Sequence, residues 1–159
     1  METAKRSASE TVKLYTVCMI ADGDRILLLD RRHDAFQGFI APGGRVDYPE
    51  SPLEGAIREV KEETGLTVRG LVFKGLAEFI NPGGERYMIF NYFTREFSGE
   101  LLTASREGVP RWVPLSRLNE VDMQDNFRRR IPLFFEAGTF ETHMNRLDPE
   151  RVWEEVRRQ

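Results

Sequence analysis

The sequence predicts a single α/β domain, and three observations support this fold class. Runs of β-branched and aromatic residues, separated by Gly, Pro, Asn and Asp, indicate strands joined by tight turns. One stretch, Pro52–Thr64, is bounded by the start and stop signals of a helix. The chain has 159 residues, of which 40% are hydrophobic, enough for one sizeable core and too few to favour a second domain.

The predicted strands lie between turn signals such as Asp22-Gly23 and Pro82-Gly83-Gly84. They are expected at 12–20, 25–29, 39–41, 67–80, 87–97, within 106–115, and at 140–144. Directly after 39–41, Pro42-Gly43-Gly44 predicts a tight turn that lets backbone carbonyls approach a ligand.

A second helix is expected over 124–135, where Pro132 must kink or restart it. Its predicted core stripe consists of Phe127, Ile131, Phe134 and Phe135. The run 128–130 is all arginine, and we interpret it mainly as a solvated face. Further on, Asp148-Pro149 offers the start of a helix over 150–158.

The Pro52–Thr64 helix has capping residues at both ends. Ser51 is a typical N-cap, Pro52 suits the first helical position, and Glu54 completes a capping box. Gly65 supplies the left-handed residue that ends a helix. One apolar stripe is expected to pack against the sheet, formed by Leu53, Ala56, Ile57, Val60 and Thr64.

Another face of this helix carries three acids, Glu59, Glu62 and Glu63. They stand at i, i+3 and i+4, so their carboxylates converge, and Gly55 one turn earlier leaves the approach open. Each like-charge pair costs about 0.2–0.5 kcal/mol. A divalent cation removes this repulsion, and Mg²⁺ suits oxygen ligands with no His or Cys nearby. The alternative interpretation is an acidic face exposed to solvent.

The helix and the loop before it resemble the signature of a known family. The pattern is Gly44, five residues, Glu50, seven residues, Arg58-Glu59-Val60, one residue, Glu62-Glu63, one residue, and Gly65-Leu66. It is similar to the complete Nudix box. The resemblance implies an α/β/α sandwich with a mixed sheet between helices, spanning 11–159. The segment 1–10 is polar and has no hydrophobic stretch, so it is expected to be a flexible terminus. The resemblance also favours a closing hairpin, rather than a helix, near 150–158.

The Nudix resemblance implies hydrolysis of a nucleoside diphosphate linked to another group. Glu59 and Glu63 correspond to the principal metal ligands, and Glu62 to a further ligand or a water-orienting group. The Gly43 carbonyl and Glu107, five residues before Trp112, are expected to join the metal shell. The implied cofactor is Mg²⁺, with Mn²⁺ as a possible substitute.

Two further implications concern the loop before the helix. Arg58 is expected to form a structural ion pair, most plausibly with Glu50. Asp47-Tyr48-Pro49-Glu50 stands where members of the family often have Glu, any residue, Gly and Glu. Proline stiffens this loop, which puts the substrate geometry in doubt and leaves the ligands unchanged.

Substrate choice depends on residues outside the box. Arg31 is a candidate phosphate ligand, or else an ordinary solvated strand end, and Gly44 allows close approach of a substrate. The order of elements resembles enzymes that hydrolyse oxidised purine nucleoside triphosphates such as 8-oxo-dGTP. Asp125 and Asn126 then read the base edge, and the alternative interpretation, which local sequence favours, is an ordinary helix N-cap. Gln124 departs from that pattern, since a base-stacking tryptophan is expected there.

Three functions stay open. The first is a nucleoside triphosphate pyrophosphohydrolase. The second is a Nudix hydrolase for another diphosphate: a nucleotide sugar, ADP-ribose, a dinucleoside polyphosphate or an RNA 5′ end. The third is a catalytically silent nucleotide sensor, which has no need to retain all three acids of the helix.

Composition limits the partners of the protein. The net charge of −3 argues against a stable nucleic-acid partner, so we expect a small-molecule nucleotide. Cys18 is the only cysteine and cannot form an internal disulfide, which favours a cytoplasmic location. No apolar run approaches the roughly 20 residues of a membrane span. A monomer and a homodimer both stay open.

Overall fold

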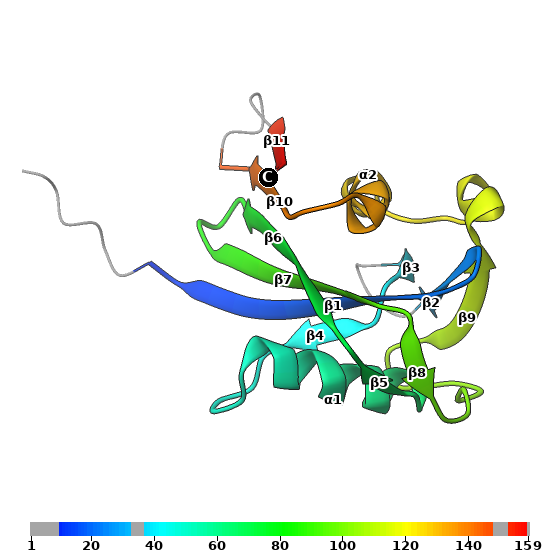
Figure 1. The fold of residues 1–159 in the computed structure, drawn as a ribbon. Coiled ribbons are helices and arrows are strands. Elements are labelled where there is room, and N and C mark those ends of the chain that lie inside the picture. Colours follow the sequence, from blue (N-terminus) through cyan, green and yellow to red (C-terminus); the bar gives the residue numbers. More distant parts are fainter. Residues whose placement is uncertain (1–9, 33–36, 148–152, 159) are drawn as a thin grey trace, which may run out of the picture.

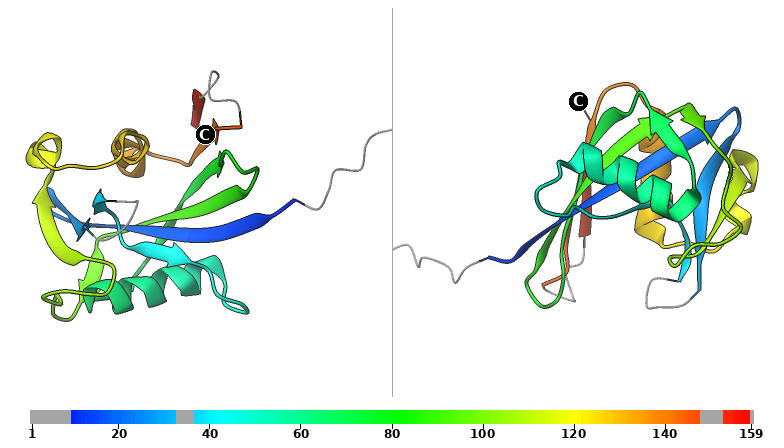
Figure 2. Two further views of the ribbon diagram at one scale, coloured as in Figure 1. Left: turned by 180° about the vertical axis from the view of Figure 1, so that it is seen from behind. Right: turned by 90° about the horizontal axis from the view of Figure 1, so that it is seen from below.

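A computed structural model describes residues 10–32, 37–147 and 153–158 of the chain. A mixed β-sheet runs through the middle of the structure (Figure 1). Helix α1 (Pro52–Thr64) lies against one face, and helix α2 (Asp125–Phe135) lies against the other (Figure 1). The views from behind and from below show the same layers (Figure 2). The predicted α/β/α sandwich is therefore confirmed.

The main sheet combines parallel and antiparallel pairs. Its order is β11 (Trp153–Arg158), β10 (Phe140–Asn145), β6 (Val72–Ile80), β7 (Arg86–Thr94), β1 (Val12–Asp22), β2 (Arg25–Arg31) and β3 (Gly38–Ile40). Off this path, β4 (Gly43–Arg45) pairs with β1 and β9 (Val109–Pro114) pairs with β2. The β1–β7 and β6–β10 pairs are parallel, and the others are antiparallel. A separate ribbon joins β5 (Thr67–Arg69) and β8 (Glu96–Ser98), and a 3₁₀ helix, η1, spans Leu115–Glu120.

Strand β1 supplies both faces of the core because its side chains alternate. Cys18 and Ile20 pack with the α1 residues Ala56 and Val60. The intervening residues of β1 pack on the α2 side, in a cluster that includes Val17, Met19, Phe127, Ile131 and Phe134. β1 is thus the strand that separates the two helix layers.

Two long predicted strands are each divided in the structure. The run 67–80 forms β5 and β6, which are separated at Gly70 with a φ of +58°. That left-handed conformation favours glycine and ends the first strand. The run 87–97 forms β7 and β8, which are separated at Arg95. β5, at the start of the first run, pairs with β8, at the end of the second run. The two form a separate ribbon rather than extending the main sheet.

The glycine turn was also predicted incorrectly. Gly43 and Gly44 begin the short strand β4, which pairs with β1. A Cβ added at Gly43 would lie 2.1 Å from the Thr16 carbonyl oxygen, so this close pairing requires glycine. The consequence is that a strand, rather than the predicted tight turn, fixes the Gly-Gly segment.

Helix α2 continues through Pro132, so the predicted restart is wrong. Burial of Ile131, Leu133 and Phe134 offsets the hydrogen bond that proline cannot donate. Phe135, expected in the core stripe, is 36% exposed.

The arginine run at 128–130 is less solvated than predicted. Arg128 donates to the carbonyls of Leu118 at 2.6 Å and Val121 at 2.8 Å, which ties α2 to η1. Arg130 is buried, and its guanidinium lies 5.5 Å from the centre of the Phe127 ring. Long aliphatic stems let both arginines pack while their polar ends bind.

The end of the chain forms the hairpin that the Nudix resemblance favours. β10 and β11 are antiparallel, with Phe140 opposite Arg158. The helix start proposed at Asp148-Pro149 lies outside the described residues, as does 1–9 of the predicted flexible segment. Glu10 is described and pairs with Arg86. Within the described part of the chain, no helix is long and apolar enough to cross a lipid bilayer.

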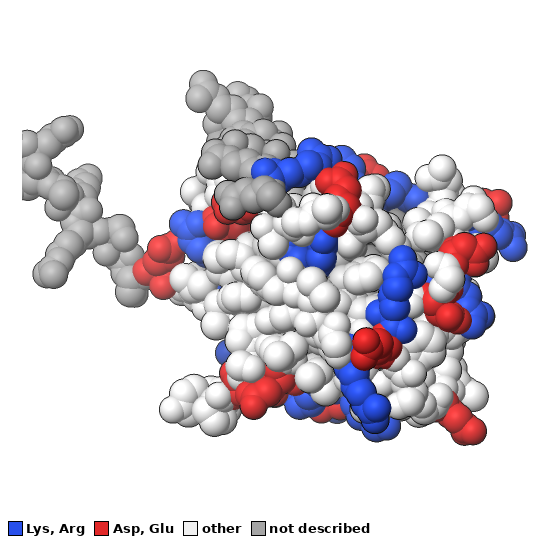
Figure 3. Space-filling model, viewed as in Figure 1, with Lys and Arg blue, Asp and Glu red and all other residues white. Residues whose placement is uncertain are grey.

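Charges of both signs are interspersed on the face shown in Figure 3. They do not gather there into a basic stripe of the kind that nucleic-acid binding requires.

Candidate active site

Both ends of α1 follow the sequence prediction. The Ser51 amide donates to Glu54 Oε2 at 2.7 Å, and the Glu54 amide donates to Ser51 Oγ at 3.2 Å. At the other end Gly65 has a φ of +81°, and its amide donates to the Lys61 carbonyl. These caps satisfy backbone groups that a helix leaves open, and so they fix where α1 begins and ends.

The buried face of α1 differs from the predicted stripe. Leu53 and Ile57 are 41% and 37% exposed, so their assignment to the core is wrong. The buried residues are Gly55, Ala56, Val60, Glu63 and Thr64. The helix is therefore rotated about its axis relative to the prediction, and this rotation brings Glu63 into the interior.

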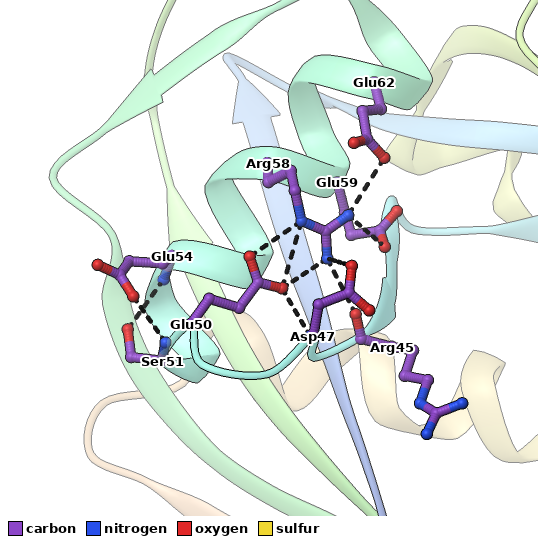
Figure 4. Close-up of polar contacts among 8 residues, drawn as sticks. All are labelled: Arg45, Asp47, Glu50, Ser51, Glu54, Arg58, Glu59 and Glu62. Atoms are coloured by element: carbon purple, nitrogen blue, oxygen red, sulfur yellow. Dashed lines mark hydrogen bonds and ion pairs between the residues drawn. The ribbon is translucent and has the colours of Figure 1, made fainter.

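Arg58 is the hub of the polar contacts around α1 (Figure 4). Its Nη2 donates to Glu50 Oε1 at 2.6 Å and to the Arg45 carbonyl at 3.0 Å. Its Nε donates to Glu50 Oε2 at 2.9 Å. Its Nη1 donates to Glu59 at 3.0 Å and to Glu62 at 3.2 Å. The guanidinium thus joins the loop before the helix to two of the helix acids, as its planar fork of donors allows.

The ion pair that was expected between Arg58 and Glu50 is present and strongly affects both groups. Hydrogen bonds from Arg58, followed by one from the Asp47 amide, lower the pKa of Glu50 to about 2. The same pairing raises the pKa of Arg58. Both groups therefore keep their charge over the whole pH range in which the protein is expected to work.

Glu59 lies directly against the Gly-Gly strand. A Cβ added at Gly44 would be 2.5 Å from Glu59 Oε1, so any other residue there would push this carboxylate away. Burial, opposed by the hydrogen bond from Arg58, raises the pKa of Glu59. Glu62 is the exposed member of the three acids, with its side chain 58% accessible.

Glu63 is the most buried acid of the site, at 4% exposure. Its Oε2 accepts a hydrogen bond from the Gly43 amide at 3.0 Å. Burial raises the pKa of Glu63 to about 8, and the nearby charges of Glu59 and Glu107 add to this effect. The Gly43 amide and Arg31 act in the opposite direction without cancelling it. A buried carboxyl held near other acids is characteristic of functional sites.

Arg31 and Glu107, which come from distant parts of the chain, meet beside Glu63. Arg31 ends β2, and its Nη2 lies 3.2 Å from Glu107 Oε2. The charges of both residues act on Glu63, which places the pair at the same end of the site. Two residues singled out separately in the sequence are therefore neighbours of each other and of α1.

The donor set fits a hard divalent cation such as Mg²⁺. Glu59, Glu62, Glu63 and Glu107 all offer carboxylate oxygens, and the nitrogen and sulfur ligands that softer metals prefer are absent from this set. In the described residues no three acidic, His or Cys side chains are gathered closely enough to form a metal cluster. Arg58 holds Glu59 and Glu62 in this arrangement. The features that fit an ion are the buried carboxyl of Glu63 and the Glu59 carboxylate, which lies against Gly44.

Asp125 and Asn126 lie apart from these acids. They begin α2, which lies on the opposite side of the sheet from α1 (Figure 1). Asp125 is exposed, and Asn126 Oδ1 accepts a hydrogen bond from the Phe127 amide at 2.8 Å. The Gly43 carbonyl was predicted to be a metal ligand. What the structure shows at this residue is a hydrogen bond from the Gly43 amide to Glu63.

Two partners of Arg58 were not identified in the sequence. They are the Arg45 carbonyl and Asp47, whose Oδ2 lies 3.4 Å from Arg58 Nη2. The spacing of Asp47 three residues before Glu50 was an available signal, because the Asp47 amide donates to Glu50 Oε1 across that turn. A backbone carbonyl, in contrast, leaves no trace in residue types.

Comparison with known proteins identifies the family of this chain. A model of the NUDIX domain matches residues 13–134, so the chain belongs to the Nudix family. It is 27% identical over 146 residues to the oxidized purine nucleoside triphosphate hydrolase of Mus musculus, covering 89% of this chain and 92% of that protein. It is 26% identical over 152 residues to an uncharacterized Nudix hydrolase, YvcI, of Bacillus subtilis, covering 86% and 95%.

A solved structure shows the same arrangement. The crystal structure of a mutator MutT protein from Bacillus halodurans superposes with a TM-score of 0.78 at 26% identity. The match covers 91% of this chain and 97% of that one. The protein is thus a Nudix pyrophosphohydrolase by family, fold and signature residues.

Proposed function

We propose that the protein is a Mg²⁺-dependent pyrophosphohydrolase of nucleoside triphosphates, with oxidised purines such as 8-oxo-dGTP as its preferred class. It releases the nucleoside monophosphate and pyrophosphate. The observation that carries the hydrolase proposal is the grouping of Glu59 and Glu63 on one helix against Gly43 and Gly44 of β4. The extended similarity to the mouse oxidized purine nucleoside triphosphate hydrolase supports the substrate class.

Each residue has a proposed role in this reaction. Glu59, Glu63 and Glu107, with Glu62 as a further ligand and the Gly43 carbonyl, hold the cation. When bound, Mg²⁺ neutralises phosphate charge and makes a water molecule more acidic. Water attacks phosphorus, the bond from phosphorus to the bridging oxygen breaks, and pyrophosphate leaves. One of the glutamates accepts the proton from water.

Two arginines also have proposed roles: Arg58 positions a glutamate of the site, and Arg31 binds the charged phosphates. Arg58, anchored by Glu50, holds Glu59 in the cation-free arrangement, and both Glu50 and Arg58 support catalysis from beside the helix acids. Arg31 binds phosphate oxygens, for which its guanidinium geometry is suited. Gly44 admits the substrate beside Glu59. Asp125 and Asn126 read the base from the α2 side.

The single buried cysteine supports a reducing location. Cys18 is fully buried, and burial raises the pKa of its thiol to about 12. A thiol this buried is inert toward thiol exchange. The proposed cytoplasmic location rests instead on the lone cysteine, which cannot form an internal disulfide. We further propose that 11–159 act as one domain and that the nucleotide is the only stable partner besides a possible second copy of the chain.

A competitive panel tests this function. Purified protein with Mg²⁺ is given 8-oxo-dGTP, ordinary dNTPs, ADP-ribose, nucleotide sugars, a dinucleoside polyphosphate and a 5′-triphosphate RNA. We expect pyrophosphate release from the triphosphates, fastest with 8-oxo-dGTP, and no turnover in EDTA. Preference for a sugar conjugate would remove the base-reading role of Asp125 and Asn126. No turnover with Mg²⁺ or Mn²⁺ would contradict the enzyme proposal and favour a catalytically silent nucleotide sensor.

A further inference from the structure

We propose that Thr16 is a positioning residue of this site, whose hydroxyl donates a hydrogen bond to the Glu59 carboxylate when Glu59 turns from Arg58 to a cation. The inference rests on the proposed function. It begins from a buried polar atom that the described structure leaves unsatisfied. Thr16 is fully buried in β1, and its Oγ1 has no hydrogen-bond partner among the described residues.

The surroundings of Thr16 place it beneath Glu59. A Cβ added at Gly55 of α1 would lie 3.6 Å from Thr16 Cγ2, so the side chain points to the α1 face of the sheet. Across the β1–β4 pair, Thr16 stands opposite Gly44, the residue whose Cα faces the Glu59 carboxylate. Gly55 and Glu59 are four residues apart, on neighbouring turns of the same helix face. The Thr16 side chain therefore lies in the corner formed by Gly44, Gly55 and Glu59, with the Glu50 carboxylate also close to the Gly55 position.

A hydroxyl in this position is difficult to explain by packing alone. Cys18 and Ile20, the next β1 residues on this face, join an apolar cluster with Ala56 and Val60. Valine has nearly the shape of threonine and would fill the same space without leaving a buried polar atom unpaired. The threonine thus lowers the stability of the protein unless its hydroxyl finds a partner in another arrangement of the site.

Glu59 is the group that gains from such a partner. Its Oε1 is bonded to Arg58 Nη1 at 3.0 Å in the present arrangement. Turning toward a cation breaks this bond at a carboxylate whose side chain is only 14% exposed in the present arrangement. A buried carboxylate needs a replacement donor, and ligands of metal ions are regularly held by a second hydrogen-bonding group behind them.

The test measures cation binding without substrate. Mn²⁺ is titrated calorimetrically into the wild type, Thr16→Val and Thr16→Ser, and thermal unfolding is recorded in EDTA. We expect Thr16→Val to weaken Mn²⁺ binding about tenfold. Thr16→Ser should restore it, because serine keeps the hydroxyl. In EDTA, Thr16→Val should melt at the same or a higher temperature than the wild type, since it removes an unsatisfied group.

A matched control is Thr142→Val, another buried threonine on a strand, located in β10 away from α1. It should leave Mn²⁺ affinity unchanged. Wild-type affinity in Thr16→Val would overturn the proposal, and so would a lower melting temperature of that variant in EDTA, which would show that the hydroxyl already has a structural partner. Failure of the wild type to bind Mn²⁺ and to turn over any substrate would instead contradict the proposed function itself.

Discussion

At the scale of the residue, two glutamates of one motif have pKa values that are shifted in opposite directions. Glu50 accepts hydrogen bonds from Arg58 and the Asp47 amide, and its pKa falls to about 2. Glu63 is buried, receives one backbone amide and faces other acids, and its pKa rises to about 8. The difference follows from what surrounds each carboxylate, since the side chains are identical. Glu50 is suited to hold Arg58, whereas Glu63 is suited to receive a cation.

The raised pKa of Glu63 predicts how the metal-free protein responds to pH. Its folded pKa exceeds the unfolded value of 4.5, so its contribution to stability is full below pH 4.5 and is lost as pH rises through about 8. Glu63→Gln has no charge to bury. In EDTA it should therefore melt higher than the wild type at pH 9, with this advantage shrinking toward pH 5.

Thermal unfolding at the two pH values measures this difference. Glu100→Gln, which changes an exposed loop acid, is the control and should show no such pH-dependent gain. A gap between Glu63→Gln and the wild type that is equal at pH 5 and pH 9 would contradict the burial of a neutral Glu63 carboxyl.

The sequence predicted several residues of the site, but it did not predict which distant residues contact each other there. The sequence alone indicated the Arg58–Glu50 pair and the importance of Glu63, because these positions belong to a motif of fixed spacing. The contact of Arg31 with Glu107 joins residues 76 positions apart through the β2–β9 pairing, and no local pattern contains that information. The same holds for Thr16, whose significance depends on Gly44 and Gly55 being close to it.

At the scale of the element, α1 shows what capping signals fix and what they do not. Ser51 and Gly65 set its ends as predicted, because caps depend on neighbours in sequence. The rotation of α1 about its own axis, which decides which residues face the sheet, was predicted less well. The helix buries Glu63 and exposes Leu53 and Ile57, so hydrophobicity alone gave the wrong stripe. A site that needs a buried acid departs from the pattern that stability alone would favour.

This rotation predicts unequal costs for truncating apolar residues of α1. Val60 is fully buried, so Val60→Ala should lower the free energy of unfolding by about 2 kcal/mol. Leu53→Ala removes a larger side chain that is 41% exposed and should cost less than about 1 kcal/mol. Urea unfolding measures both values. A Leu53→Ala cost equal to or above that of Val60→Ala would restore the predicted stripe and contradict the observed rotation.

At the scale of the whole molecule, β1 connects the chemistry to the fold. It pairs with β4 on one side and in parallel with β7 on the other, so the Gly-Gly strand is held at the centre of the structure. The sequence predicted the layers through the family resemblance. It did not predict the separate β5–β8 ribbon or the position of β4, because strand pairing between distant segments depends on register and tertiary packing.

In the proposed function, the acids of α1 hold the cation that hydrolysis requires. The most direct measurement is pyrophosphate release from the best triphosphate of the panel, with Mg²⁺, by the wild type, Glu63→Gln and Glu54→Gln. The last is a matched acid-to-amide change on the same helix, and glutamine can still complete the capping box. We predict at least about a 100-fold lower turnover for Glu63→Gln. Glu54→Gln should stay within about threefold of the wild type. Near-normal turnover by a folded Glu63→Gln would show that Glu63 does not hold a cation that hydrolysis requires.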